Sequence, residues 1–156
     1  MKKTNNKGFS LVELIVVIAI MAVLMVVVAP QMLRYVERTR IQRDNTAISE
    51  IANAVKVAMA DENVNSNTTT GTTVAAAKNG TVVEFTFSDA TALGKELKAV
   101  FGEKVTLSSN TYCALTADFP TLTITKASGN VKVEGSNLLD PDTSKYGSDD
   151  SGKLTY

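Results

Sequence analysis

The segment KGFSLVELIVVIAIMAVLMVVVAP, residues 7–30, decides the fold class of this chain. Between residues 9 and 29 the only polar side chains are those of Ser10 and Glu13, and Glu13 carries the only charge. A helix of these 21 residues is about 31 Å long, which matches the hydrocarbon core of a bilayer. A single segment in lipid satisfies its backbone hydrogen bonds only as a helix. The segment therefore predicts a membrane-spanning helix.

The composition excludes several classes of function. The 156 residues suffice for one domain and an anchoring segment. Lys+Arg and Asp+Glu both number 16, so there is no basic surplus to attract nucleic acid. Histidine is absent and Cys113 is the only cysteine, which excludes an internal disulfide, Cys/His metal sites and histidine-dependent triads. Cys113 is most simply a small buried core residue, with an intermolecular bridge or a reactive thiol as alternatives. We predict no catalytic residues and no enzyme activity.

A secretory signal peptide is the competing interpretation of the apolar segment, because Lys2, Lys3 and Lys7 precede it. It fits poorly, since the apolar block exceeds the usual length of about 7–15 residues and contains a glutamate. The block also ends in VVVAPQM rather than in an A-x-A site. The flanking charges leave the orientation open, because four arginines follow the span: Arg34, Arg38, Arg40 and Arg43.

The residues KGFSLVEL resemble the processing site of type IV prepilins and related pseudopilins. The likeness includes a short basic leader, Gly8 at its end, Phe9 next, and Glu13 before an unbroken apolar run. It covers about residues 1–60 and is closer to the type IVa class than to type IVb. It implies that a prepilin peptidase cuts between Gly8 and Phe9 on the cytoplasmic side and that Phe9 is then N-methylated. It also implies that the leader lies inside and the globular head outside.

Glu13 needs a physical reason, since a carboxylate at the bilayer centre costs about 2.5–3.5 kcal/mol. Cleavage would leave an ammonium on Phe9, four residues and about one helical turn away, at the positive end of the helix dipole. A paired charge is tolerated better than a lone one. The resemblance implies that Glu13 meets the terminal ammonium of a neighbouring subunit during filament assembly. The alternative is that Glu13 extends its carboxylate to the lipid headgroups.

The helix is predicted to continue beyond the span. Pro30 should kink it or locally open it, or else mark the end of the span. Apolar residues then recur at spacings of three, four and seven up to Met59, so we expect one helix over about residues 10–61. The four arginines, with Glu37 and Asp44, form a charged band that faces solvent or headgroups, or pairs with acidic groups of the next subunit.

The remainder predicts a small head. Residues 62–80, rich in Asn, Thr and Gly, are expected to be a loop. Strands are expected at 81–87, 104–108, 111–117, 121–127 and 130–134, with a hairpin turn at Ser128-Gly129-Asn130. Between the first two, a short helix should be capped by Asp89 and closed by Gly102. The fold class is α+β: a long N-terminal helix, with an apolar membrane or filament-core half and an amphipathic half, packed on a small antiparallel sheet.

The predicted organisation is a leader at 1–8, a transmembrane or filament-core half-helix at 9–30 and a soluble head at 31–156. The head comprises an amphipathic half-helix at 31–61, the loop at 62–80, a sheet with a short helix at 81–135, and a C-terminal loop at 136–156. That last loop carries oxygens of the type Ca²⁺ prefers, although no complete calcium loop is present. Its weak candidates are Asp140, Asp142, Asp149 and Asp150. We otherwise predict no metal and no cofactor.

These observations lead to a predicted function. The chain is expected to be a major-type pilin that polymerises through its apolar helix into a type IV pilus, a fimbrium that supports adhesion or motility. Its expected partners are other copies of itself, the membrane, prepilin peptidase and the pilus assembly machinery. Loss of the leader leaves 13 basic against 16 acidic side chains, so binding of nucleic acid by bulk charge is not expected.

The expected location is the cytoplasmic membrane for the prepilin, and then the extracellular filament. The nearest alternative is a pseudopilin of a type II secretion or DNA-uptake system, which shares the whole N-terminal argument. A second alternative is a membrane-anchored binding module that never polymerises.

Overall fold

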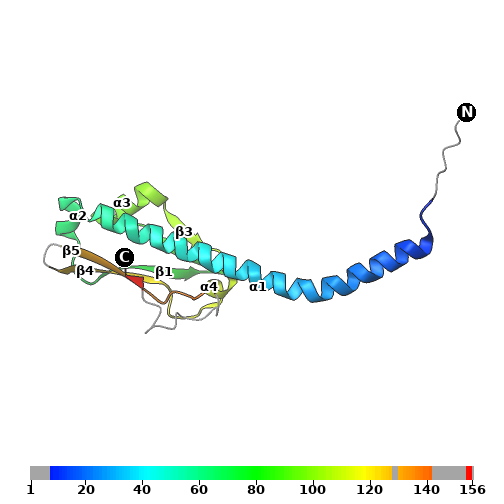
Figure 1. Cartoon of the computed structure of the whole chain (residues 1–156). Coiled ribbons are helices and arrows are strands. Elements are labelled where there is room, and N and C mark those ends of the chain that lie inside the picture. Colours follow the sequence, from blue (N-terminus) through cyan, green and yellow to red (C-terminus); the bar gives the residue numbers. More distant parts are fainter. Residues whose placement is uncertain (1–7, 128–129, 142–153, 156) are drawn as a thin grey trace, which may run out of the picture. The chain divides into compact units, whose positions relative to one another are not determined.

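The computed structural model describes residues 8–127, 130–141 and 154–155, of which the last two are described by their backbone alone (Figure 1). The chain divides into two units, residues 1–36 and 37–156. Helix α1, Leu11–Ala58, contributes to both. The predicted single long helix is therefore confirmed, with ends within three residues of those expected.

The first unit is the N-terminal part of α1 and the residues before it. All residues from 8 to 36 are exposed, including the large apolar ones. Pro30 lies inside the helix. The helix continues because a proline removes one backbone hydrogen bond and the neighbouring turns retain theirs. The predicted kink at Pro30 remains a prediction.

The second unit pairs the remainder of α1 with an antiparallel sheet. In the described residues the strand order is β3-β2-β1-β4-β5-β6. The strands are β1 (Thr72–Asn79), β2 (Val82–Thr86), β3 (Lys104–Leu107), β4 (Thr121–Ala127), β5 (Asn130–Ser136) and β6 (Leu154–Thr155). Three short helices accompany them: α2 (Glu62–Asn67), α3 (Ala92–Phe101) and α4 (Asn110–Ala114). This arrangement confirms the predicted α+β class.

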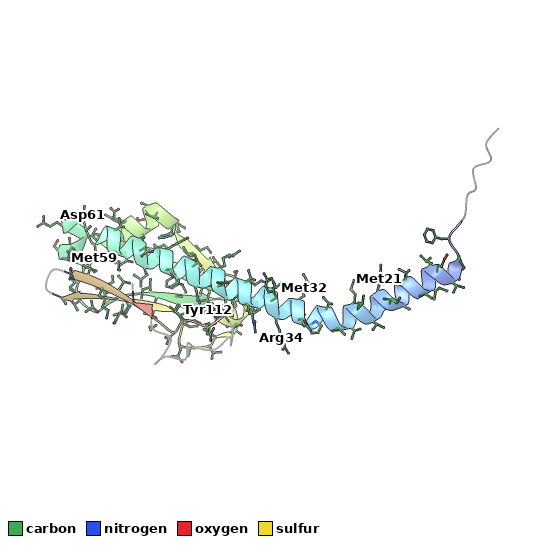
Figure 2. The ribbon with its side chains drawn as sticks, in the orientation of Figure 1. Met21, Met32, Arg34, Met59, Asp61 and Tyr112 are labelled. Atoms are coloured by element: carbon green, nitrogen blue, oxygen red, sulfur yellow. The ribbon has the colours of Figure 1, made fainter. Side chains whose placement is uncertain are left out.

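The core lies between α1 and the sheet. One face of α1 buries apolar side chains at helical spacing: Ile41, Ile48, Ile51, Ala52 and Val55. The sheet supplies Val83, Phe85, Leu107, Leu122, Ile124 and Val133 to the same core. Burying each large aliphatic or aromatic side chain contributes about 1.5–3 kcal/mol. Figure 2 labels Met59, which directly follows α1 and is also buried.

Helix α3 begins two residues later than predicted. Thr91 caps it, its Oγ1 accepting a hydrogen bond of 3.0 Å from the Gly94 amide. The prediction that Asp89 caps it is wrong, because Asp89 instead pairs with the Lys98 Nζ at 2.6 Å. Gly102 closes the helix as predicted, at a positive φ of 80° that favours glycine.

Two predictions about elements of the head are wrong. Residues 62–80 are not a loop, since Glu62–Asn67 form α2, capped by Asp61, and Thr72–Asn79 form the strand β1. Strand β1 pairs with β2 on one side and β4 on the other, and this pairing outweighs its weak intrinsic strand propensity. Residues 111–117 are not a strand, because Ser109 caps the helix α4 there. Cys113 is half-buried rather than fully buried in the core.

The C-terminal predictions are partly corrected. The hairpin of β4 and β5 is confirmed, with Ala127 opposite Asn130. Ser128 and Gly129 lie outside the described residues. The expected loop over 136–156 is wrong at both ends, since β5 extends to Ser136 and β6 pairs with Glu134 and Gly135. Hairpin pairing is thus one means by which the C-terminal region joins the sheet.

Candidate processing and assembly site

The two residues that flank the predicted cleavage point are open to solvent. Phe9 exposes 93% of its surface. A Cβ added to Gly8 would meet no heavy atom within 4 Å. Folding therefore places no steric demand on either residue within the described chain. Any requirement for glycine at position 8 must come from a partner that recognises it.

Glu13 lies in the first turn of α1 and folds back on Ser10. The Ser10 amide donates a hydrogen bond of 2.9 Å to the Glu13 carboxylate, while the Leu14 amide donates to the Ser10 carbonyl at 3.3 Å. This is the acidic half of a capping box, and it satisfies one of the amides that a helix start leaves unpaired. It holds the Glu13 carboxylate at the positive end of the helix, against the amide of Ser10, which directly follows Phe9.

The hydrogen bond between Ser10 and Glu13 was not anticipated from the sequence. Its signal was present, because Ser-x-x-Glu before an apolar run is the capping-box pattern. The bond gives Glu13 a role within its own chain as well as the predicted role toward a neighbour.

The helix surface beyond Glu13 is apolar and uncovered. Figure 2 shows Met21 and Met32 projecting from this part of the ribbon. Within the described residues α1 is the one helix long and apolar enough to cross a membrane, with a mean hydropathy of 3.2 over its most apolar 18-residue window. None of that window is buried. An apolar surface of this extent marks a site of contact with lipid or protein.

In the head, Asp44 binds the loop before α4. Only 2% of Asp44 is exposed. Its carboxylate accepts hydrogen bonds of 2.8 and 2.7 Å from the amides of Ser108 and Ser109, and one of 2.9 Å from the Ser108 hydroxyl. Such charge-assisted bonds are stronger than neutral ones. They fasten the start of α4 to α1.

Glu37 makes a second attachment to the same loop. Its Oε1 accepts bonds of 2.8 Å from the Ser109 hydroxyl and the Thr111 amide, and one of 3.0 Å from the Thr111 hydroxyl. Its Oε2 has no hydrogen-bond partner, with Arg40 at 3.8 Å. Burial acts to raise the pKa of Glu37, but these hydrogen bonds and Arg40 outweigh burial and hold the pKa below its ordinary value.

Asn45 and Tyr112 connect α1 to the C-terminal segment. The Tyr112 hydroxyl donates to the Asn45 Oδ1 at 2.6 Å and accepts from the Leu139 amide at 2.9 Å. The Asn45 Nδ2 donates to the Leu139 carbonyl at 2.8 Å. Figure 2 labels Tyr112, which is fully buried. This network gives the chain, which has one cysteine, a non-covalent attachment for its C-terminal segment.

These contacts correct the predicted charged band. Arg34, Arg38, Arg40 and Arg43 are exposed as expected. Glu37 and Asp44, however, bind Ser108, Ser109 and Thr111 inside the head and do not belong to a solvated face. We call Glu37 and Asp44, with the backbone and hydroxyl groups that they accept from, the carboxylate clasp.

The calcium candidates fall mostly outside the described residues. Asp140 is half-buried, while Asp142, Asp149 and Asp150 are not described. In the described part of the chain, His, Cys, Asp and Glu residues form no group of three that could hold a metal ion. The weak calcium prediction remains a prediction.

Comparison with known proteins bears on the N-terminal segment. The family model of the prokaryotic N-terminal methylation motif matches residues 3–29. Comparisons with curated proteins and with solved structures gave no match.

The motif and the fold together show what the chain resembles. The chain carries the N-methylation motif typical of type IV pilins and type II pseudopilins, on a pilin-like fold of a long N-terminal helix and an antiparallel sheet. Pilins, which carry this motif, are structural proteins and not enzymes. The motif implies processing by prepilin peptidase and handling by an assembly machinery. With the apolar helix, it also implies anchoring in the inner membrane.

Proposed function

We propose that this chain is a major-type pilin, a structural subunit that polymerises through its apolar N-terminal helix into a type IV pilus on the bacterial surface. The observation that carries the proposal is the surface of residues 11–36, which is apolar over most of its length and exposed throughout. Lipid covers such a surface in the membrane, and neighbouring copies of the same helix cover it in a filament. The filament then supports adhesion or motility.

Processing precedes assembly in this proposal. Prepilin peptidase cuts between Gly8 and Phe9, with the leader in the cytoplasm and the head outside, and Phe9 is N-methylated. The openness of both residues supports access by the peptidase. Pro30 is proposed to kink the helix, so that its two halves adapt separately to the filament core and the head.

Glu13 then stabilises the contact between docked subunits. Its carboxylate, held at the helix start by the Ser10 amide, pairs with the Phe9 ammonium of a neighbouring copy. A low-dielectric filament core strengthens this attraction relative to water. An ammonium left there without a partner is costly, and that cost arises only when subunits dock.

The test compares wild type with Glu13→Gln, by measuring the protein in the membrane fraction and in sheared surface filaments. Membrane insertion should be equal or better, since the substitution removes a charge that costs a few kcal/mol in lipid. The filament fraction should fall. Glu62→Gln, which changes an exposed glutamate of α2 in the same way, is the matched control and should leave both fractions unchanged.

Equal filament yields from wild type and Glu13→Gln would mean that Glu13 only reaches the headgroups. Wild-type protein that is processed but absent from surface filaments would instead favour a pseudopilin of secretion or DNA uptake. An intact Met1 by mass spectrometry of the membrane-extracted protein would favour an anchored binding module.

A further inference from the structure

Within the second unit, α1 has a face that the sheet does not cover. Residues 43, 47, 50, 54 and 57 follow one another at steps of four and three, so they share one side of the helix. We call this set the outer ridge: Arg43, Ala47, Glu50, Ala54 and Val57. Arg43, Glu50 and Val57 are exposed, and the two alanines are half-buried. The buried residues of α1 lie on other sides of the helix.

The ridge carries one charge of each sign, seven residues apart. Seven residues span about 10.5 Å along a helix, which is too far for Arg43 and Glu50 of one chain to pair. Residues three and four away from either side chain include no opposite charge. Neither Arg43 nor Glu50 has an ion-pair partner in the part of the chain that the structure describes. Arg40, by contrast, lies 3.8 Å from Glu37.

The surface around Glu50 is suited to close contact with another helix. Ala47 and Ala54 are small, and small side chains at the point of contact allow the shorter of the usual interaxial distances of about 8–10 Å. Val57 is 75% exposed, and the neighbouring Val100 of α3 is 65% exposed. Between α1 and α3 lies a groove of about 350 Å³ whose lining includes Ala54, Val57 and Val100. An apolar surface with isolated charges is typical of a protein interface.

We propose that the outer ridge binds a second copy of this chain, with Arg43 of one copy paired to Glu50 of the next. The two helices would run parallel with an offset of seven residues, about 10.5 Å. This proposal rests on the proposed polymerisation, in which every copy enters the membrane in the same direction. Because each copy offers both an arginine and a glutamate, the contact is heterologous and repeats along a filament.

The charge pair would set the register of the filament more than its total stability. Complementary charges across an interface suppress wrong alignments, since like charges in contact cost several kcal/mol. A shift of one helical turn would remove Arg43 from Glu50 and place it against an uncharged residue, which is alanine, threonine or asparagine. The apolar residues of the ridge tolerate several registers, whereas the charge pair favours one.

Charge reversal in the full chain, expressed with its assembly machinery, tests the pair. Arg43→Glu and Glu50→Arg should each lower sheared-filament yield by about tenfold or more, because like charges then meet. The double variant Arg43→Glu/Glu50→Arg should restore yield to near wild type. Lys95→Glu and Glu62→Arg, reversals at exposed residues of α3 and α2, are the controls and should assemble normally. Equal amounts in the membrane fraction show that each variant folds and inserts.

Cysteine cross-linking in a Cys113→Ser background tests the direction and offset. The proposed offset places residue 47 of one copy beside residue 54 of the next. Ala47→Cys/Ala54→Cys should therefore form a ladder of oxidised oligomers, while Ala47→Cys alone should not cross-link. Closed dimers from Ala47→Cys alone would indicate an antiparallel contact and overturn the proposal.

Single reversals that assemble like wild type, or a double variant that fails to recover, would also overturn the ridge pairing. In either case the polymerisation of the wild-type chain would stand. Absence of wild-type filaments would instead remove the proposed function, and the ridge pairing with it.

Discussion

The side chains of the two parts of α1 have different environments. Residues 11–36 are apolar over most of their length and all exposed, and their partners must be lipid or other chains. From Glu37 onward the helix buries apolar residues against its own sheet and binds its own loop through two carboxylates. One continuous helix can therefore leave one part exposed for contact with other molecules and bury the other part in the core of its own head.

The largest expected effect comes from separating these parts. A fragment of residues 31–156 should remain soluble, monomeric and folded, because the core of the head lies entirely within it. Membrane association and filament formation should both be lost. Circular dichroism and sedimentation of the purified fragment measure this. A disordered fragment would show that the head depends on residues 9–30. A fragment that forms filaments unaided would show that residues 9–30 do not drive polymerisation.

Substitutions of Gly8 should affect leader removal, and substitution of Gly94 should affect packing of the head. Gly8→Val should abolish or strongly slow leader removal without changing head stability, since no heavy atom lies within 4 Å of a Cβ at residue 8. Gly8→Ala should slow it less. Mass spectrometry of the membrane-extracted protein measures the fraction processed. Normal processing of Gly8→Val would count heavily against the prepilin interpretation.

Gly94→Ala should give the converse result. Its Cβ would lie 2.1 Å from the Ser88 carbonyl oxygen, so the backbone must shift. Overpacking of this kind costs about 1–3 kcal/mol or more, and it should lower the melting temperature of the head by several degrees. Leader removal should proceed as in wild type. A Gly94→Ala head as stable as wild type would show that the Ser88 carbonyl moves freely.

The carboxylate clasp should matter most at Asp44. Asp44→Asn replaces an acceptor by a donor opposite the Ser108 and Ser109 amides, and it should destabilise the head by about 2–3 kcal/mol. Urea unfolding of the fragment measures this. Asp61→Asn is the matched control, because Asp61 is an exposed helix cap and asparagine caps equally well. Equal losses from both would mean that burial of Asp44 is unimportant.

The sequence predicted those features that depend on neighbouring residues. Helix α1 followed from an apolar run and then a helical period, and β4 and β5 followed from alternation around a hairpin turn. The capping bond between Ser10 and Glu13 was equally local and could have been read from Ser-x-x-Glu.

Features that depend on distant residues were predicted wrongly. The start of α4 is held by Asp44 and Glu37, which lie 64 to 74 residues away, so alternation in TYCALTA suggested a strand. The alanine-rich β1 is a strand because it pairs on both sides, and nothing in its own residues indicates this. Asp44 looked like a surface charge because its partners are backbone amides.

The smallest expected effect is at Glu37, and it depends on pH. Because the folded pKa of Glu37 lies below its ordinary value, ionised Glu37 stabilises the head at neutral pH. That contribution is complete above the ordinary value of 4.5 and is lost as pH falls through the lowered folded pKa. Arg40, whose guanidinium lies 3.8 Å from the Glu37 carboxylate, remains protonated throughout this pH range.

Glu37→Gln should therefore cost about 1 kcal/mol at pH 7, since glutamine still accepts at Oε1 but carries no charge. The difference from wild type should shrink below pH 4.5, where protonated Glu37 and glutamine are both neutral acceptors. Urea unfolding of the fragment at pH 7 and at several lower pH values measures both quantities. A difference that stays constant with pH would mean that Glu37 acts through shape and not through its charge. Asp44 would then be the only one of the two carboxylates that attaches α1 to the loop before α4 through its charge.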